Sequence, residues 1–202
     1  MIPALKIAYK NPSWRLRFAV AENAAQLSKY LDQGTVDTQI LPFYNDLMTD
    51  KEPEVRSEAV NRIPELAECA NPSLIVSKIL PTLKLTMVSE QSQHVVGSMA
   101  FAVCKLGGQI SQQDAAQYLI PLVSILLKNK TTEVIVSLVD NLEPLFKTIG
   151  EVLLIEKLIP AIINLASDKT WRIRLAVLNF IPKMASFVSK ETFTQKIEQT
   201  LV

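Results

Sequence analysis

The sequence predicts an all-α fold: a right-handed α-solenoid of about five two-helix repeats followed by one extra helix. The main observation is a ladder of prolines at intervals of 39, 39, 40 and 39 residues, formed by Pro3, Pro42, Pro81, Pro121 and Pro160. A period of this size, kept along the whole chain, is typical of helical repeat arrays. Such arrays act mostly through extended surfaces offered to other proteins, so the expected function is binding.

A second ladder keeps the same period, 13 or 14 residues after each proline, at Leu16, Val55, Val95, Val134 and Ile173. Five residues before each of these stands a polar residue: Asn11, Asp50, Glu90, Asn129 or Asp168. Directly after each stands Arg17, Arg56, Val96, Ile135 or Arg174. Because two ladders in phase are hard to obtain by accident, they establish the repeat.

The composition suits packed helices and excludes several functions. Hydrophobic residues make up 49% of the 202 residues and only 5 are glycine, which favours helices over a sheet with tight turns. With 21 Lys and Arg against 20 Asp and Glu, the chain lacks the basic surface that nucleic-acid binding needs. No apolar run is long enough for a membrane span, and Pro3 and Lys6 interrupt the only apolar start that could be a secretory signal.

Three residues with reactive side chains receive structural interpretations. Cys69 and Cys104, the only cysteines, lie in sequence typical of a helix interior. We expect them to be reduced and packed as small apolar residues, which favours the cytoplasm or the nucleus. His94, the only histidine, has no partner at metal-ligand spacing and is expected at a turn or on the surface. Neither a metal nor a cofactor is expected.

The ladders predict one array over residues 1–202, with units near 1–34, 35–70, 71–110, 111–150 and 151–189 and with 190–202 starting a further repeat. First helices are expected near 2–10, 38–49, 73–88, 112–128 and 152–167. Second helices are expected near 13–30, 53–69, 93–107, 132–148 and 171–188. Apolar residues at helical spacing, interrupted by polar breaks such as Thr49–Pro53, support these bounds.

The ladder prolines fall inside the first helices. Each deletes one backbone hydrogen bond and crowds the preceding turn, so a kink is expected there. Pro64 and Pro182 share one position in their second helices and are expected to shape the stack. The apolar segment Ile197–Val202 has no partner helix, and only two residues precede Pro3. We therefore expect a piece of a longer array, and end-to-end self-association through the terminal helices stays open.

Paired helices with a proline in the first, a polar turn, and Val-Arg opening the second resemble HEAT repeats. Within that family the chain is similar to the scaffolding A subunits of protein phosphatase 2A. The segments that carry this resemblance are Trp14–Arg17, Pro53–Ala59, Gln93–Val95, Leu158–Ile162 and, most strongly, Asp168–Ala176. The two Trp-Arg-x-Arg segments, four repeats apart, suggest the middle of such an array, around the seventh to the eleventh repeat.

The resemblance implies a non-catalytic scaffold whose turns between paired helices form a ridge. That ridge would hold both the catalytic and the regulatory subunits of a serine/threonine phosphatase. Candidate contact residues on the turns are Trp14, Arg15, Lys51, Glu52, Glu54, Lys169, Trp171 and Arg172. The two tryptophans are favoured as anchors because binding energy concentrates in such side chains; the alternative is that they cap the seam between adjacent repeats.

A structural role is assigned to Arg17, Arg56 and Arg174. Each stands six residues after a polar turn residue, and within a stack it would meet the acid of a neighbouring turn, such as Asp50 or Asp168, and satisfy helix ends. In two repeats the arginine is replaced, by Val96 and by Ile135. These replacements put the polar ladder in doubt at those repeats, but not the stacking.

Two rival functions follow from the same sequence. One is another HEAT-repeat protein, such as a transport receptor or a chromosome-organising protein, although those families have more irregular repeat lengths. The other is a helical enzyme. The sequence offers no glycine loop for phosphate, no paired catalytic carboxylates and no Ser-His-Asp arrangement, and Gly107-Gly108 indicates a helix end. We therefore expect no enzymatic activity.

Overall fold

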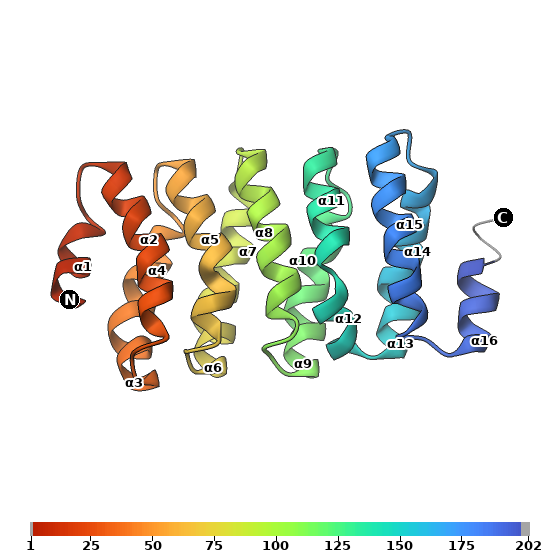
Figure 1. The fold of residues 1–202 in the computed structure, drawn as a ribbon, viewed down its shortest axis with the longest axis horizontal. Helices are drawn as coiled ribbons and strands as arrows, with labels where there is room; N and C mark the ends of the chain where they lie inside the picture. Colours follow the sequence, from red (N-terminus) through yellow and green to blue (C-terminus); the bar gives the residue numbers. More distant parts are fainter. Residues whose placement is uncertain (1, 199–202) are drawn as a thin grey trace. The chain divides into compact units, whose positions relative to one another are not determined.

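The computed structural model describes residues 2–198, which form an α-solenoid of paired helices without a strand in that range (Figure 1). These residues fall into two compact units, divided between Ala102 and Val103 inside one helix. None of the described helices is long and apolar enough to cross a membrane.

The first unit contains three first helices and three second helices. Its elements are α1 (Ile2–Ala8), α2 (Trp14–Ser28), α3 (Gln33–Thr35), η1 (Val36–Ile40), α4 (Leu41–Leu47), α5 (Pro53–Ala67), α6 (Pro72–Leu74), η2 (Ile75–Ile79), α7 (Leu80–Ser89) and α8 (Gln93–Leu106), the last of which extends into the second unit. The short α and η segments run on without a break, so that α3, η1 and α4 make one first helix and α6, η2 and α7 make the next.

The second unit repeats this pattern. Its elements are α9 (Gln112–Asp114), η3 (Ala115–Leu119), α10 (Ile120–Leu126), α11 (Thr132–Asn141), α12 (Glu143–Ile149), α13 (Glu151–Leu153), η4 (Leu154–Leu158), α14 (Ile159–Asn164), η5 (Leu165–Ser167), α15 (Trp171–Ala185), α16 (Lys190–Thr192) and η6 (Phe193–Glu198). The further first helix expected over 190–202 is present as α16 and η6, and its residues 199–202 lie outside the described part of the chain.

A π-helical turn precedes four of the ladder prolines. In each case the N–H just before the proline donates to the carbonyl five residues earlier, as from Leu41 to Val36 and from Leu80 to Ile75. The same bond joins Ile120 to Ala115 and Ile159 to Leu154. A proline ring crowds the carbonyl four residues before it, and widening this turn relieves the crowding. The interruption expected at the ladder prolines is therefore a wide turn.

Side-chain caps start most first helices at the same repeat position. Asp32, Asn71, Ser111 and Ser189 each accept a hydrogen bond from a backbone N–H in the first turn. Such caps satisfy donors that have no partner within the helix. The fifth position is Gly150, with φ of +76°, which side-chain-bearing residues rarely adopt.

The core lies between neighbouring second helices and under the first helices. In the first unit α2 packs on α5, and in the second unit α11 packs on α15. The second ladder is buried at Val55, Val95, Val134 and Ile173, as its apolar period predicts, whereas Leu16 is exposed.

Three expectations need correction. The helix expected over 132–148 is broken at Leu142, because Pro144 cannot donate a hydrogen bond and crowds the turn before it. The first helix expected from residue 38 begins at Gln33, because the Asp32 side chain caps it. Cys69 lies just after the end of α5 and is only half-buried, whereas Cys104 is fully buried in α8 as expected.

Candidate functional site

The five turns between paired helices share one local construction. The side-chain oxygen of each polar ladder residue accepts the backbone N–H two residues later, with N···O distances of 2.7–2.9 Å. The acceptors are Asn11, Asp50, Glu90, Asn129 and Asp168. This local bond competes with helix formation and ends the turn at the start of the second helix. The turns are therefore held in one shape by their own sequence.

The ladder arginines reinforce these turns from inside. Nη1 of Arg56 donates to the carbonyls of Asp50 and Lys51, at 2.7 and 3.1 Å. Nη1 of Arg17 and of Arg174 makes the equivalent pair of bonds to its own turn, at 2.8 and 3.1 Å in both cases. Each arginine thus satisfies two carbonyls that a tight turn leaves without a partner.

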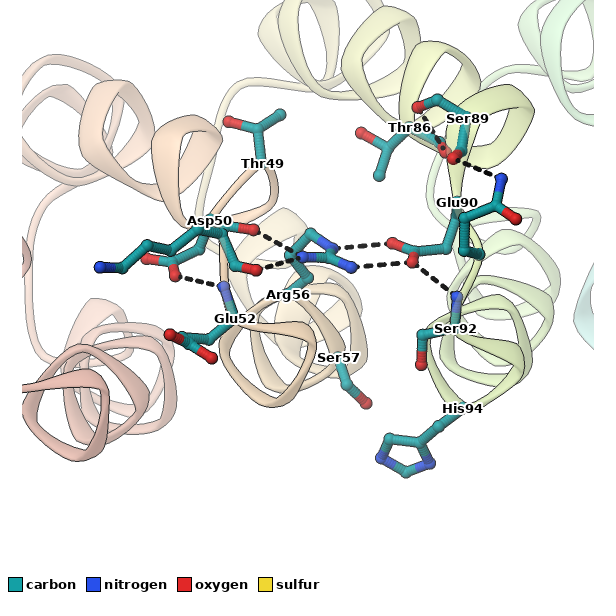
Figure 2. A network of polar contacts seen from close by, with 12 residues as sticks. Thr49, Asp50, Glu52, Arg56, Ser57, Thr86, Ser89, Glu90, Ser92 and His94 are labelled. Carbon is teal, nitrogen blue, oxygen red and sulfur yellow. Dashed lines mark hydrogen bonds and ion pairs between the residues drawn. The ribbon is translucent and has the colours of Figure 1, made fainter.

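The other edge of the guanidinium joins one turn to the next. Nε and Nη2 of Arg17 bind the carboxylate of Asp50 at 2.6 and 2.8 Å. Arg56 binds the carboxylate of Glu90 in the same way at 2.7 and 2.8 Å (Figure 2). Two parallel charge-assisted bonds fix direction as well as distance. The first three turns are therefore tied in line, which confirms the structural role predicted for Arg17, Arg56 and Asp50.

Both acids of this ladder are held in their charged form. Burial alone would raise the pKa of the Asp50 carboxyl, but hydrogen bonds from Arg17 and from the Glu52 N–H outweigh it, so the pKa is lowered. The pKa of Glu90 is lowered for the same reasons, by Arg56 and by the Ser92 N–H acting against burial. The Arg56–Glu90 pair also forms the floor of a cleft of about 230 Å³ between two turns, with Thr49, Thr86 and Ser89 on its walls (Figure 2).

The ladder loses its donors where the sequence departs from arginine. Val96 and Ile135 are buried apolar side chains, so they pack but offer no hydrogen bond. Asp168 still shapes its own turn through the Thr170 N–H, but within residues 2–198 it receives no arginine from a neighbouring repeat. The ion pair expected at Asp168 is therefore absent from the described residues, because Ile135 stands where the arginine would.

The predicted contact residues differ in how openly they are presented. Trp14 is half-buried, and the guanidinium of Arg15 lies over its ring at 4.8 Å. Trp171, by contrast, is 63% exposed at the start of α15. Arg172 beside it is exposed and pairs with Glu133 at 3.1 Å.

The remaining candidates surround two turns. Lys51, Glu54 and Lys169 are exposed, and Glu52 is half-buried. No cross-repeat partner had been predicted for Arg172. Glu133 stands one repeat period, 39 residues, before it in the sequence, so this pair could have been found from spacing alone. The turns thus offer both charges and an open tryptophan to a partner.

The described side chains do not form a metal centre. No group of three or more His, Cys, Asp or Glu side chains that could hold a metal ion occurs among residues 2–198. His94 is exposed at the start of α8. Sγ of Cys104 contacts the carbonyl of Leu138 at 3.6 Å, and burial raises the pKa of its thiol.

Comparison with known protein families and relatives follows the same repeats. The family described as PPP2R1A-like HEAT repeat matches residues 35–111, and the family described as HEAT repeat matches residues 158–188. The chain carries HEAT repeats. A curated relative is the beta isoform of the 65 kDa regulatory A-type chain of human serine/threonine-protein phosphatase 2A, 31% identical over 123 residues. That match covers 59% of this chain and 20% of the relative, so the HEAT repeats here span about a fifth of its length.

Solved structures with a similar fold include natural and designed repeat proteins. Cex1p matches with a TM-score of 0.73 at 17% identity, over 92% of this chain and 36% of that protein. A designed armadillo repeat protein matches with a TM-score of 0.64 at 20% identity, over 99% of this chain and 88% of the design. Another design, solved in complex with the peptide (KR)4, matches with a TM-score of 0.65 at 20% identity, over 98% of this chain and 87% of the design. At these identities the likeness shows that HEAT repeats share an α-solenoid fold with them.

Proposed function

We propose that this chain is a non-catalytic scaffold that holds the catalytic and regulatory subunits of a serine/threonine protein phosphatase. The observation that carries the proposal is the 31% identity to a 65 kDa regulatory chain of phosphatase 2A, in a chain whose repeats also match the PPP2R1A-like family. We also propose that it works in the cytoplasm or the nucleus, where the thiols of Cys69 and Cys104 stay reduced.

The turns supply the binding surface in this proposal. Their backbones are fixed by side-chain caps and arginines, so little conformational entropy is lost when a partner docks. The side chains that point away from the stack include Trp171 and Arg172, residue types in which binding energy concentrates. Lys51 and Glu54 add charges that would steer a partner rather than anchor it.

The test is direct binding to purified phosphatase subunits. The chain is immobilised, and the catalytic and one regulatory subunit of phosphatase 2A are applied separately in biolayer interferometry. Replacement of Trp171 and Arg172 by alanine is expected to weaken binding of at least one of these two proteins tenfold or more, since truncating an anchor typically costs about 2 kcal/mol or more.

The matched control is Tyr30→Ala. Tyr30 is an equally exposed aromatic residue, but it follows α2, at the opposite end of the second helix from the proposed ridge. Its replacement should leave both affinities unchanged. If neither phosphatase protein binds the folded parent chain, or if Tyr30→Ala weakens binding as much as the double variant, the proposal fails.

A further inference from the structure

We propose that Arg174 and the exposed face of α15 form a docking site for a helix of a partner protein, one that carries Asp or Glu three residues before its first helical residue. The site is separate from the phosphatase contacts proposed above and does not depend on them. It is built from two features of the second unit: an apolar stripe and an arginine with one unused edge.

The apolar stripe runs along α15. Trp171, Leu175 and Leu178 stand at helical spacing i, i+4 and i+7, so they share one face, and they are 63%, 47% and 54% exposed. The position of Leu178 is fully buried in each preceding second helix, where it is occupied by Ala21, Val60, Ala100 and Val139. In those repeats this face packs; in α15 the same face is open, and water meets three large apolar side chains.

The unused edge belongs to Arg174. Its Nη1 binds the carbonyls of Asp168 and Lys169 at 2.8 and 3.1 Å, as Nη1 of Arg56 binds its own turn at 2.7 and 3.1 Å. In Arg56 the opposite edge, Nε and Nη2, is occupied by a carboxylate. Among residues 2–198 no acceptor meets Nε or Nη2 of Arg174. The guanidinium is thus already oriented to receive a carboxylate.

The equivalent contact in the first unit defines the occupant. There α5 presents its arginine and its buried face to α8, and Ser57 and Ser98 of the two helices lie 2.8 Å apart. Glu90, which binds Arg56, stands three residues before Gln93, the first residue of α8. An incoming helix with an acid at this place would meet Arg174 and cover Leu175 and Leu178 together.

Local charge favours an acidic turn on the incoming helix. Lys169 and Arg172 flank the turn next to Arg174, and Glu133 is the acid paired there, with Arg172. The stripe supplies apolar area and the arginine supplies register, because two parallel hydrogen bonds admit one orientation of the carboxylate.

The probe for this site is a fluorescein-labelled synthetic peptide with the sequence of residues 88–107 of this chain, which contains Glu90 and the whole of α8. Fluorescence anisotropy is measured while the full chain is titrated. We expect saturable binding. Glu90→Gln in the peptide, or Arg174→Gln in the protein, should weaken it tenfold or more, because each leaves one charge without its partner in a covered site.

Two further variants separate docking from folding. Leu178→Asp changes an exposed side chain, so the helix content and thermal midpoint should be kept while peptide binding is lost. Lys183→Gln removes a positive charge from α15 on the side that faces Glu143, half a helical turn away from Arg174, and should leave binding unchanged.

Three outcomes would overturn the proposal. These are no saturable binding of the peptide, equal binding to the parent, Arg174→Gln and Leu178→Asp proteins, or equal effects of Arg174→Gln and Lys183→Gln. Light scattering is run beside the titration. A dimer of the chain that Leu178→Asp dissolves would assign this face to a second copy instead of a partner helix, and would also overturn the proposal.

Discussion

The carboxylate of Glu90 accepts two hydrogen bonds from the guanidinium of Arg56, at 2.7 and 2.8 Å, across 34 residues of sequence (Figure 2). The side chain of Glu90 is 2% exposed and that of Arg56 is 18% exposed, so the pair is shielded from water. Arg56 also binds two carbonyls of its own turn. One side chain therefore closes one turn and fixes the distance to the next.

Replacing Arg56 by glutamine should destabilise the chain more than replacing an arginine that lies on the surface of the same helix. Arg56→Gln leaves a buried carboxylate and two carbonyls without donors, which we expect to cost about 2–4 kcal/mol of unfolding free energy. Arg62→Gln is the control, because Arg62 pairs with Glu58 and Glu65 on a more open surface. Its loss should cost about 1 kcal/mol or less.

Urea unfolding followed by circular dichroism measures both variants against the parent chain. Equal losses from Arg56→Gln and Arg62→Gln would show that the shielded pair holds the turns no better than a surface pair does.

Acid should weaken the chain through Asp50 and Glu90. The folded-state pKa of each is lowered, so each contributes stability above the ordinary carboxyl pKa of about 4, and loses it as the pH falls through the folded pKa. The thermal midpoint should fall between pH 7 and pH 3, and fall less in a double variant with Asp50→Asn and Glu90→Gln. A parallel fall in both proteins would assign the acid sensitivity to other groups.

Much of this architecture can be predicted from periodicity. A spacing of 39 or 40 residues places both helices of every repeat, and the six-residue offset between Asp50 and Arg56 predicts a polar ladder. These features depend on contacts that recur in each repeat, so each repeat supplies independent support for them. The distance between turns was therefore open to prediction, and so was the loss of the donor at Ile135.

Other features depend on single neighbours and could not be predicted from the period. The break at Leu142 follows from Pro144, which has no counterpart at that offset in the other second helices. The difference between Trp14 and Trp171 depends on whether a neighbouring cation covers the ring: Arg15 lies over Trp14, whereas Arg172 pairs with Glu133. The alternative interpretation, a seam residue, suits the half-buried Trp14 better than the open Trp171.

Two glycines of the third repeat should respond to alanine in opposite directions. A Cβ at Gly107 would lie 2.6 Å from Cα of Leu145, a backbone atom that cannot move aside, so Gly107→Ala should cost about 1–3 kcal/mol. A Cβ at Gly97, inside α8, would meet nothing within 4 Å. Gly97→Ala should therefore stabilise the helix by about 0.5–1 kcal/mol.

Thermal unfolding of the two single variants beside the parent decides this point. The expected order of midpoints is Gly97→Ala above the parent and Gly107→Ala below it. A Gly107→Ala midpoint at or above that of the parent would mean that α12 can shift away from the turn after α8.

Restoring an arginine at Ile135 should rebuild the missing connection to Asp168. Ile135 is buried, so Ile135→Arg loses apolar burial of about 1.5–3 kcal/mol, which the new ion pair has to offset. The side chain of Arg17 is only 7% exposed at the same repeat position, so the stack accommodates an arginine there. The single variant should consequently be close to the parent in stability. The informative quantity is the coupling between positions 135 and 168.

A double-mutant cycle with Asp168→Asn isolates that coupling. Asparagine keeps the local turn, because Asn11 and Asn129 accept the same N–H bond in their own repeats, and it removes only the charge. We expect Asp168→Asn to cost about 1–3 kcal/mol more in the Ile135→Arg background than in the parent. Additive effects of the two substitutions would mean that the two turns are not held at the spacing that Arg56 and Glu90 keep, and that the ladder needs more than its arginine.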